Sequence, residues 1–205
     1  MKRALILVDL QNDFFPNGSL PIPRSLEILP VINSLLDKSF DFKIATKDWH
    51  PANHMSFASV HGLKAGDKVS VDGLEQILWD THCVQDTPGA EFYSDWHSEK
   101  IDQVITKGTD VRIDSYSTFF DNDHKKVTDL YDYLKKNKVD ELYIAGLATD
   151  YCVKYSVLDA AYLGFKIYVV ADACRAVNLR QGDEERAFEA MKNAGARIID
   201  SHCVR

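Results

Sequence analysis

The chain has 205 residues, of which 45% are hydrophobic and 27% charged. This length and composition allow one continuous buried core and exclude wholesale disorder. Asp and Glu number 31 against 24 Lys and Arg, which gives a formal net charge of −7. So acidic a chain has no general attraction for nucleic-acid phosphates or anionic lipid, and we expect neither nucleic acid nor membrane as a partner.

The N-terminal region contains no recognisable targeting segment. Its longest apolar run, Ala4–Val8, is too short for the core of a signal peptide or for a membrane span, so we expect a cytoplasmic protein. The cysteines are scattered and form no Cys-x-x-Cys pair, which in a reducing compartment predicts free thiols. They are Cys83, Cys152, Cys174 and Cys203.

Short apolar runs alternate with amphipathic helical segments along the chain. Near-continuous apolar runs are typical of strands buried on both faces, and the predicted strands cover residues 4–8, 41–46, 102–106, 141–145, 166–170 and 196–199. Apolar residues at helical spacing predict helices over residues 25–38, 127–134, about 149–164 and 187–194. Pro30 fits only the first turn of its helix, and Thr149 or Asp150 could form the N-cap of the third.

This alternation predicts a three-layer α/β fold, in which a six-stranded parallel sheet carries helices on both faces. We expect residues 1–205 to form a single domain with a long insertion at about residues 49–100. The insertion is rich in His and Gly and weakly periodic, and inserted segments of this size are usually functional. Because it follows the second strand, we expect it to cover the carboxyl edge of the sheet.

Reactive side chains follow several of the predicted strands. Asp9 ends the first strand, Asp48 and His50 follow the second, Lys107 ends the third and Cys152 follows the fourth. Ligand sites of open α/β sheets lie beyond the carboxyl ends of the strands. If these strands are neighbours, one crevice gathers a carboxylate, an ammonium, a thiol and metal-binding side chains.

Cys152 is the most informative of these residues. A thiol in the first turn of a helix meets free N–H groups and the positive end of the dipole, which favour the thiolate, and Lys107 would favour it further. The position alone leaves a nucleophile and a buried structural cysteine as even alternatives. Asp9 could accept the proton of Cys152, or it could merely cap a turn and pair with Lys107.

The insertion is also a candidate metal site. Asp48 and His50 form an Asp-x-His unit whose oxygen and nitrogen suit Zn²⁺, Fe²⁺ or Mn²⁺. His54, His61 and His82 follow in the same insertion and could complete the ligand set. Surface His and Asp residues are common, so ordinary loop residues are the alternative. Aromatic residues that could line the crevice, if they are not core, are Phe14, Trp49, Trp79, Tyr116 and Tyr151.

Six ordered motifs run from the first predicted strand to the helix after the fourth. They are Asp9–Phe14 (DLQNDF), Thr46–His54 (TKDWHPANH), Trp79–Gln85 (WDTHCVQ), Gly89–Glu91 (GAE), Lys107-Gly108 and Gly146–Val153 (GLATDYCV). Together they resemble the nicotinamidase/pyrazinamidase branch of the isochorismatase-like hydrolases, and the match continues to the last helix. Single pieces such as Lys-Gly mean little, but the ordered set is specific and favours the nucleophile interpretation of Cys152.

The resemblance implies a six-stranded parallel sheet, an Asp–Lys–Cys triad and one divalent metal ion, with Zn²⁺ expected and Fe²⁺ or Mn²⁺ as alternatives. Carried over by position, the triad is Asp9, Lys107 and Cys152. The implied metal ligands are Asp48, His50 and His82, while His54 contacts either the metal or a bound water. The implied oxyanion hole is formed by the backbone N–H groups of Ala148 and Cys152, often with a cis peptide before Ala148. The implied substrate contacts are Phe14, Trp79, Tyr116 and Leu147.

The implied reaction converts nicotinamide and water to nicotinate and ammonia, a step of NAD salvage, with pyrazinamide as a further substrate. The sequence leaves homo-oligomerisation open. One alternative is an isochorismatase or another amide hydrolase of the same fold, but isochorismatase chemistry needs neither thiol nor metal. Another is a catalytically silent metal-binding protein, which would have a broken triad.

This chain departs from the family pattern at Asp80, where the family usually has a proline. The absence of the proline would loosen the loop that carries His82, and the aspartate would add a charge near the metal.

Overall fold

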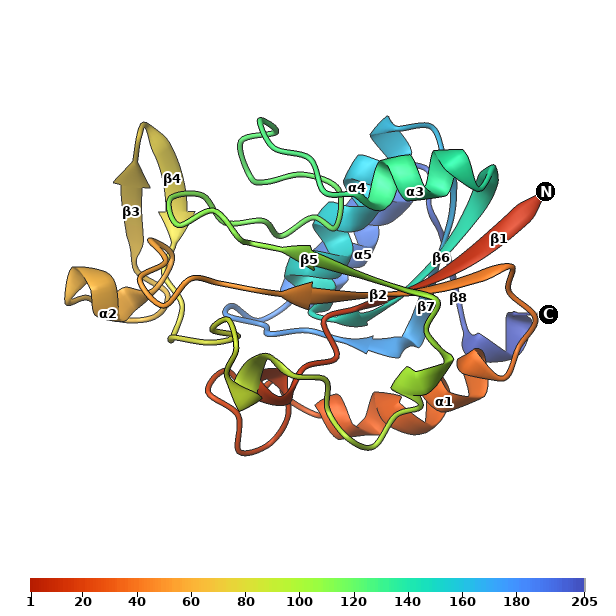
Figure 1. Cartoon of the computed structure of the whole chain (residues 1–205), viewed down its shortest axis with the longest axis horizontal. Helices are drawn as coiled ribbons and strands as arrows, with labels where there is room; N and C mark the ends of the chain where they lie inside the picture. The colour runs from red at the N-terminus through yellow and green to blue at the C-terminus, as the bar shows by residue number, and fades with distance from the viewer. Residues whose placement is uncertain (205) are drawn as a thin grey trace.

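The computed structural model describes residues 1–204 and is built on one six-stranded sheet (Figure 1). The strand order is β5-β2-β1-β6-β7-β8, and every neighbouring pair is parallel. The strands are β1 (Lys2–Val8), β2 (Phe42–Asp48), β5 (Gln103–Lys107), β6 (Val139–Leu147), β7 (Lys166–Arg175) and β8 (Arg197–Ile199). The predicted six-stranded parallel sheet is therefore confirmed.

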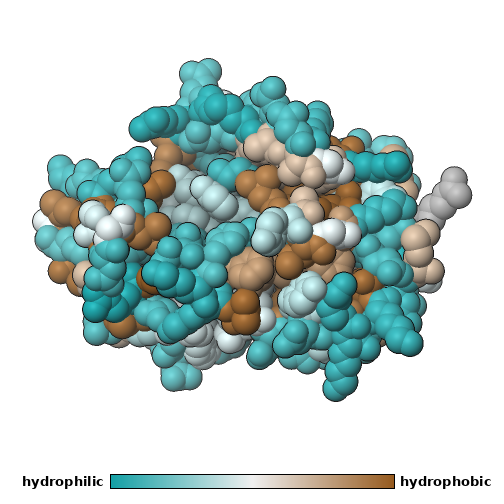
Figure 2. All heavy atoms as spheres, turned by 90° about the horizontal axis from the view of Figure 1, so that it is seen from above, coloured by the Kyte–Doolittle hydropathy of each residue, from teal (hydrophilic) through white to brown (hydrophobic). Residues whose placement is uncertain are grey.

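Helices cover both faces of this sheet, as predicted. Helix α1 (Leu29–Leu36) lies on one face, and α3 (Leu130–Lys136), α4 (Lys154–Tyr162) and α5 (Asp183–Asn193) lie on the other (Figure 1). Pro30 sits in the first turn of α1, where its missing N–H has no helical partner to lose. Seen from above in Figure 2, hydrophilic residues predominate on the surface and smaller hydrophobic clusters interrupt them. Among residues 1–204, no helix is long and apolar enough to cross a membrane.

Two local predictions about the helices are wrong. Val127 does not belong to the apolar face of α3: it precedes the helix, is 69% exposed and bridges to Phe120. Neither Thr149 nor Asp150 caps the helix after β6. A π-helical turn, Thr149–Val153, precedes α4, and the Asp150 carboxylate instead accepts the N–H groups of Val177 and Asn178. In both cases a tertiary contact outweighs the local pattern.

The insertion has more structure than its weak periodicity predicts. It contains the short helix α2 (Ala58–His61) and an antiparallel hairpin of β3 (Lys68–Val71) and β4 (Leu74–Ile77), which the sequence did not reveal because the strands are short and mostly solvent-facing. The hairpin stands beyond the carboxyl end of β2 (Figure 1). The insertion therefore lies at the carboxyl edge of the sheet, as expected.

The topology reverses between β1 and β6. From β1 the chain crosses to β2 on one side, whereas from β6 it crosses to β7 on the other. Such a switch point opens a crevice beyond the strand ends, which is where open α/β sheets bind ligands. Asp9 directly follows β1, and Cys152 lies in the turn that follows β6.

We predict that Gly146 is indispensable for the packing of β1 against β6. Its φ is +122°, and an added Cβ would lie 2.2 Å from the carbonyl oxygen of Val8. Gly146→Ala should lower the free energy of unfolding by about 3–5 kcal/mol, since backbone strain and a collision add together.

Gly164→Ala is the matched control, because Gly164 also has a positive φ of +84° but open space around it. It should cost only about 1–2 kcal/mol. Urea-induced unfolding of both variants makes the comparison, and equal losses would contradict the close approach of the two strands.

Candidate active site

The buried side chains of Asp9, Lys107 and Cys152 meet at the carboxyl edge of the sheet. The Lys107 ammonium nitrogen lies 2.8 Å from Asp9 Oδ2 and 3.3 Å from Cys152 Sγ. Asp9 and Lys107 are nearly inaccessible to solvent, and Cys152 is 7% exposed at the wall of a pocket. The structure thus brings together the three residues that the sequence predicts to act as one group.

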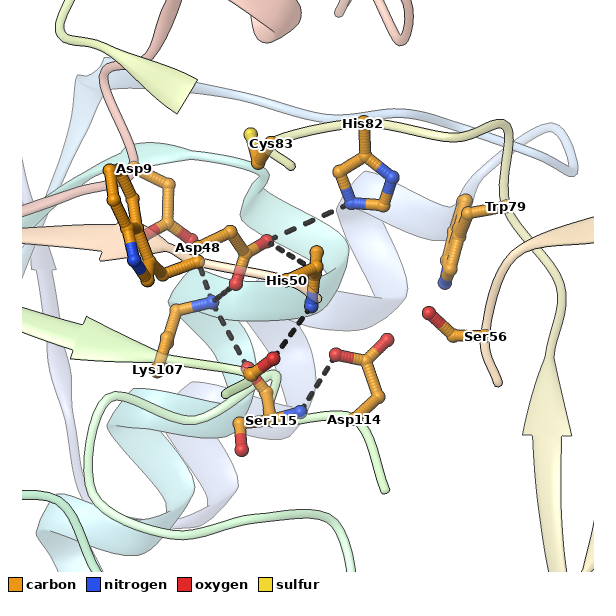
Figure 3. Close-up of polar contacts among 12 residues, drawn as sticks. Asp9, Asp48, His50, Ser56, Trp79, His82, Cys83, Lys107, Asp114 and Ser115 are labelled. Carbon is orange, nitrogen blue, oxygen red and sulfur yellow. Dashed lines mark hydrogen bonds and ion pairs between the residues drawn. The ribbon is translucent and has the colours of Figure 1, made fainter. Parts of the chain in front are cut away.

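Lys107 also contacts Asp48 and the loop after β5. Its ammonium nitrogen lies 2.5 Å from Asp48 Oδ1 and 3.0 Å from the carbonyl oxygen of Ser115 (Figure 3). Lys107 and Asp48 are register partners at the ends of β5 and β2, so the sheet itself sets this contact. One ammonium therefore joins the thiol and two buried carboxylates.

Burial and Lys107 together determine the protonation of these groups. Burial raises the pKa of Asp9 above its ordinary value, although the Lys107 ammonium opposes the shift. Burial also acts to raise the pKa of Asp48, but Lys107 and His50 outweigh it and hold that pKa below its ordinary value. Asp9 is therefore the better proton acceptor of the two carboxylates.

In the folded protein, burial opposes the local effects that favour a thiolate at Cys152. Burial raises the pKa of the Cys152 thiol well above its usual range, and the Lys107 ammonium offsets this only in part. Cys152 also lies in the π-helical turn rather than in the first turn of a regular helix. The thiol is the resting form, so its reaction needs a base, and Asp9 is the adjacent candidate.

A second group of buried side chains forms a candidate metal centre. Asp48 Oδ2 lies 3.7 Å from His50 Nε2 and 3.9 Å from His82 Nε2 (Figure 3). His50 Nδ1 is bonded to the carbonyl oxygen of Gly108 at 2.9 Å, and His82 Nδ1 to that of Asp80 at 2.7 Å. These bonds turn both Nε2 atoms toward Asp48, and His50 Nε2 is buried without a hydrogen-bond partner. A divalent metal ion fits this donor set.

The backbone around these histidines explains two sequence features. Gly108 has a φ of +66°, and a Cβ there would lie 2.4 Å from the His50 ring, so only glycine allows the carbonyl contact. Asp80 replaces the usual proline, but its side chain is exposed and its carbonyl holds His82. A proline would offer the same carbonyl, so the substitution leaves this contact intact.

Of the two further candidate ligands, His54 and His61, only His54 lies beside the centre. Its ring centroid lies 4.4 Å from that of His50, its Nδ1 is 2.7 Å from Ser56 Oγ, and its Nε2 is buried without a partner. His61 instead contacts the carbonyl oxygen of Met55 and stays outside the centre.

The pocket beside Cys152 has about 370 Å³ of empty space, its open mouth included. Phe14, Trp79 and Tyr116 line it, as the resemblance implies, and Tyr116 Oη accepts a hydrogen bond from Trp79 Nε1 at 3.1 Å.

Leu147 does not line the pocket: it is fully buried, and Ala148 reaches the wall instead. The peptide bond between them is cis, as the resemblance also implies. The remaining lining residues are Leu20, Ile22, Asp48, His82, Asp114, Tyr151, Cys152 and Val177.

Three buried residues at the site were not singled out from the sequence. The Gln11 amide bonds both the N–H and the carbonyl oxygen of Asp48, and the Thr46 hydroxyl donates to Asp9 Oδ1 at 2.5 Å. Both lie within the motifs, so the motifs gave a signal for them. Asp114 gave none, because it lies outside the motifs in a polar stretch of unremarkable composition.

An isochorismatase-domain model matches residues 3–203, so the chain belongs to the isochorismatase family of α/β proteins. Within the family it is similar to the nicotinamidase of Escherichia coli, at 47% identity over 96% of this chain and 93% of that protein. It resembles the structure of a nicotinamidase/pyrazinamidase from Acinetobacter baumanii, with a TM-score of 0.94 and 40% identity over 98% of this chain and 97% of that one. It also resembles a Pyrococcus horikoshii pyrazinamidase solved in complex with zinc, with a TM-score of 0.79 and 38% identity over 98% and 99% of the two chains.

We predict that alkylation of Cys152 by iodoacetamide accelerates continuously as the pH rises from 6 to above 9. The folded-state pKa of this thiol is raised, so the reactive thiolate fraction keeps growing over this range. Peptide mass spectrometry separates Cys152 from the exposed Cys203, which serves as the internal reference. A rate that levels off below pH 7 would indicate a thiolate already formed at neutral pH and would contradict the effect of burial.

Proposed function

We propose that the chain is a nicotinamidase that hydrolyses nicotinamide to nicotinate and ammonia, with Cys152 as the nucleophile, and that it also accepts pyrazinamide. The observation that carries the proposal is the contact of one buried ammonium, Lys107, with both Asp9 and Cys152 beside an aromatic-lined pocket. The similarity to nicotinamidases over nearly the full chain supports the same reaction.

In the first half-reaction, Asp9 accepts the Sγ proton of Cys152 as the sulfur forms a bond to the amide carbon. The negative charge that develops on the carbonyl oxygen faces the backbone N–H groups of Ala148 and Cys152, which would form the oxyanion hole. Asp9 then returns the proton to the amide nitrogen, the C–N bond breaks and ammonia leaves. The product is a thioester on Cys152.

In the second half-reaction, Asp9 accepts a proton from a water molecule as the water oxygen attacks the thioester carbon. The C–S bond breaks, the sulfur recovers the proton from Asp9, and nicotinic acid is released and loses its carboxyl proton to water to give nicotinate. The raised pKa of Asp9 suits a group that must take and return a proton in each half-reaction. Lys107 stays charged throughout, because its pKa is held well above its ordinary value by the two carboxylates against the effect of burial.

The pocket walls suit a flat heteroaromatic ring. Phe14 and Trp79 would contact the faces or edges of the ring, while Tyr116 fixes the Trp79 indole through its hydroxyl. Because the apolar side chains of Leu20 and Ile22 also reach the pocket, ring burial contributes to binding.

We further propose that Asp48, His50 and His82 hold one divalent metal ion, with Zn²⁺ preferred over Fe²⁺ or Mn²⁺. The buried, unpartnered His50 Nε2 is the observation in favour. When bound, the ion supplies a Lewis-acidic contact for the ring nitrogen of the substrate and for ordered water. Asp48 would face both the ion and Lys107, one carboxylate oxygen toward each.

Two alternatives fit the structure less well. An isochorismatase-type reaction uses neither the thiol nor the histidine cluster, which would leave buried donors such as His50 Nε2 without a role. A silent metal-binding protein would not need the thiol beside Lys107 and Asp9.

The purified protein should release ammonia from nicotinamide, and Cys152→Ala should lower kcat roughly 10⁴-fold or more, because no other thiol reaches the pocket among the described residues. Cys203→Ala, a change at an exposed thiol, is the matched control and should keep full activity. A coupled ammonia assay with nicotinamide and pyrazinamide provides the measurement. No ammonia release by the parent protein, or full activity of the Cys152 variant, would refute the proposal.

Elemental analysis should find about one equivalent of a first-row metal in the parent protein and less in each of Asp48→Ala, His50→Ala and His82→Ala. Removal of the metal with a chelator should weaken substrate binding as well as turnover, because the ion contacts the substrate ring. Cys152 should stay reactive toward iodoacetamide in the stripped protein. A fully active parent without metal would overturn the assignment.

A further inference from the structure

Asp114 is a buried carboxylate to which neither the motifs nor the proposed reaction gives a role. It is 3% exposed, lines the pocket together with Asp48 and His82, and lies within 4.8 Å of ligand atoms of His50 and His54. In Figure 3 it projects toward the space between His50 and Trp79. Asp114 therefore lies beside the candidate metal centre, at the wall of the same pocket.

The backbone of Asp114 is held in place from two directions. Its N–H donates to Gln76 Oε1 on β4 at 3.1 Å, and its carbonyl oxygen accepts the N–H of Asn122 at 2.8 Å. The Gln76 amide also donates to the carbonyl oxygen of Arg112 at 2.9 Å, which ties the hairpin to this loop. These bonds fix the backbone of the loop that carries Asp114, and the side chain itself is buried.

The Asp114 carboxylate lacks a cationic partner among residues 1–204. Its one hydrogen bond is to the neighbouring N–H of Ser115 at 2.7 Å, whereas every ion pair of Lys107 goes to Asp9 or Asp48. A buried carboxylate without a counter-charge is costly, and the nearby Lys107 ammonium is already shared by two other carboxylates. A divalent cation would supply that counter-charge.

His54 lies at the same place, but its Nε2 is not free to bind an ion in this arrangement. Its Nδ1 accepts the N–H of Ser56 at 3.1 Å, so the neutral ring carries its proton on Nε2. His50 differs, because its Nδ1 faces the carbonyl oxygen of Gly108 and its buried Nε2 has no partner, so His50 is the ring beside Asp114 that can bind a metal.

We propose that Asp114 completes the metal centre by contributing a second carboxylate to the ion that Asp48, His50 and His82 hold. This inference rests on the metal site of the proposed function and extends its ligand set. Asp114 belongs to a group of candidate ligands that shares His50 with the group of Asp48, His50 and His82, and it lines the same pocket as Asp48 and His82. A second carboxylate favours metals that prefer oxygen ligands, such as Mn²⁺, more than it favours Zn²⁺.

Asp114→Asn tests the proposal, because it removes the charge while an amide oxygen can still accept the Ser115 N–H. Zn²⁺ and Mn²⁺ affinities of the stripped protein are measured by chelator competition, without substrate. We expect the variant to bind Zn²⁺ roughly 10–100-fold more weakly and to lose more affinity for Mn²⁺. Asp110→Asn, on the same loop but paired with Lys126, is the matched control and should bind both ions like the parent.

Affinities in Asp114→Asn within twofold of the parent values, or an equal loss in Asp110→Asn, would overturn the proposal. Asp114→Ser serves as a second removal of the charge if the asparagine variant does not fold, and circular dichroism checks the fold of each protein. A parent that binds neither ion would refute the metal site of the proposed function as well. A parent that binds both ions, with Asp114 variants that bind them equally well, refutes only the role of Asp114.

Discussion

The buried ammonium of Lys107 is the interaction on which the rest of the site depends. It contacts Asp9, Asp48 and Cys152 in a region that water barely reaches. Without this positive charge, two buried carboxylates would face each other uncompensated, which is far more costly in a protein interior than at a surface. The ammonium thus makes it possible to place a proton acceptor directly beside the thiol.

The parallel sheet is what makes this arrangement possible. The strands β5, β2, β1 and β6 are consecutive neighbours in the sheet. Lys107 ends β5 and Asp48 ends β2, while Asp9 directly follows β1 and the turn that carries Cys152 follows β6. Parallel neighbours end at the same edge, so residues separated by more than a hundred positions meet without a dedicated scaffold. The close approach at Gly146 lets β1 and β6 sit side by side where the topology reverses.

Asp48 connects the two halves of the site. One of its oxygens contacts Lys107 and the other faces His50 and His82, while the Gln11 amide fixes its backbone. The charge of the candidate metal centre and the charge around the thiol are therefore coupled through one carboxylate. Because backbone carbonyl oxygens hold the Nδ1 atoms of His50 and His82, the orientation of those rings is set by the chain itself and does not depend on the ion.

The sequence alone determined the layer order, the six parallel strands and the residues gathered at their carboxyl ends, because buried strands read as apolar runs and the reactive side chains directly follow them. It could not determine the resting state of Cys152: local position favours a thiolate, but burial raises the pKa of the thiol, and burial is a property of the packed fold. Nor could it place Asp114, because its position near His50 and the bond of its N–H to Gln76 join segments that are far apart in the chain. Strand ends follow from local patterns, whereas charge balance and solvent exclusion exist only once distant segments have packed together.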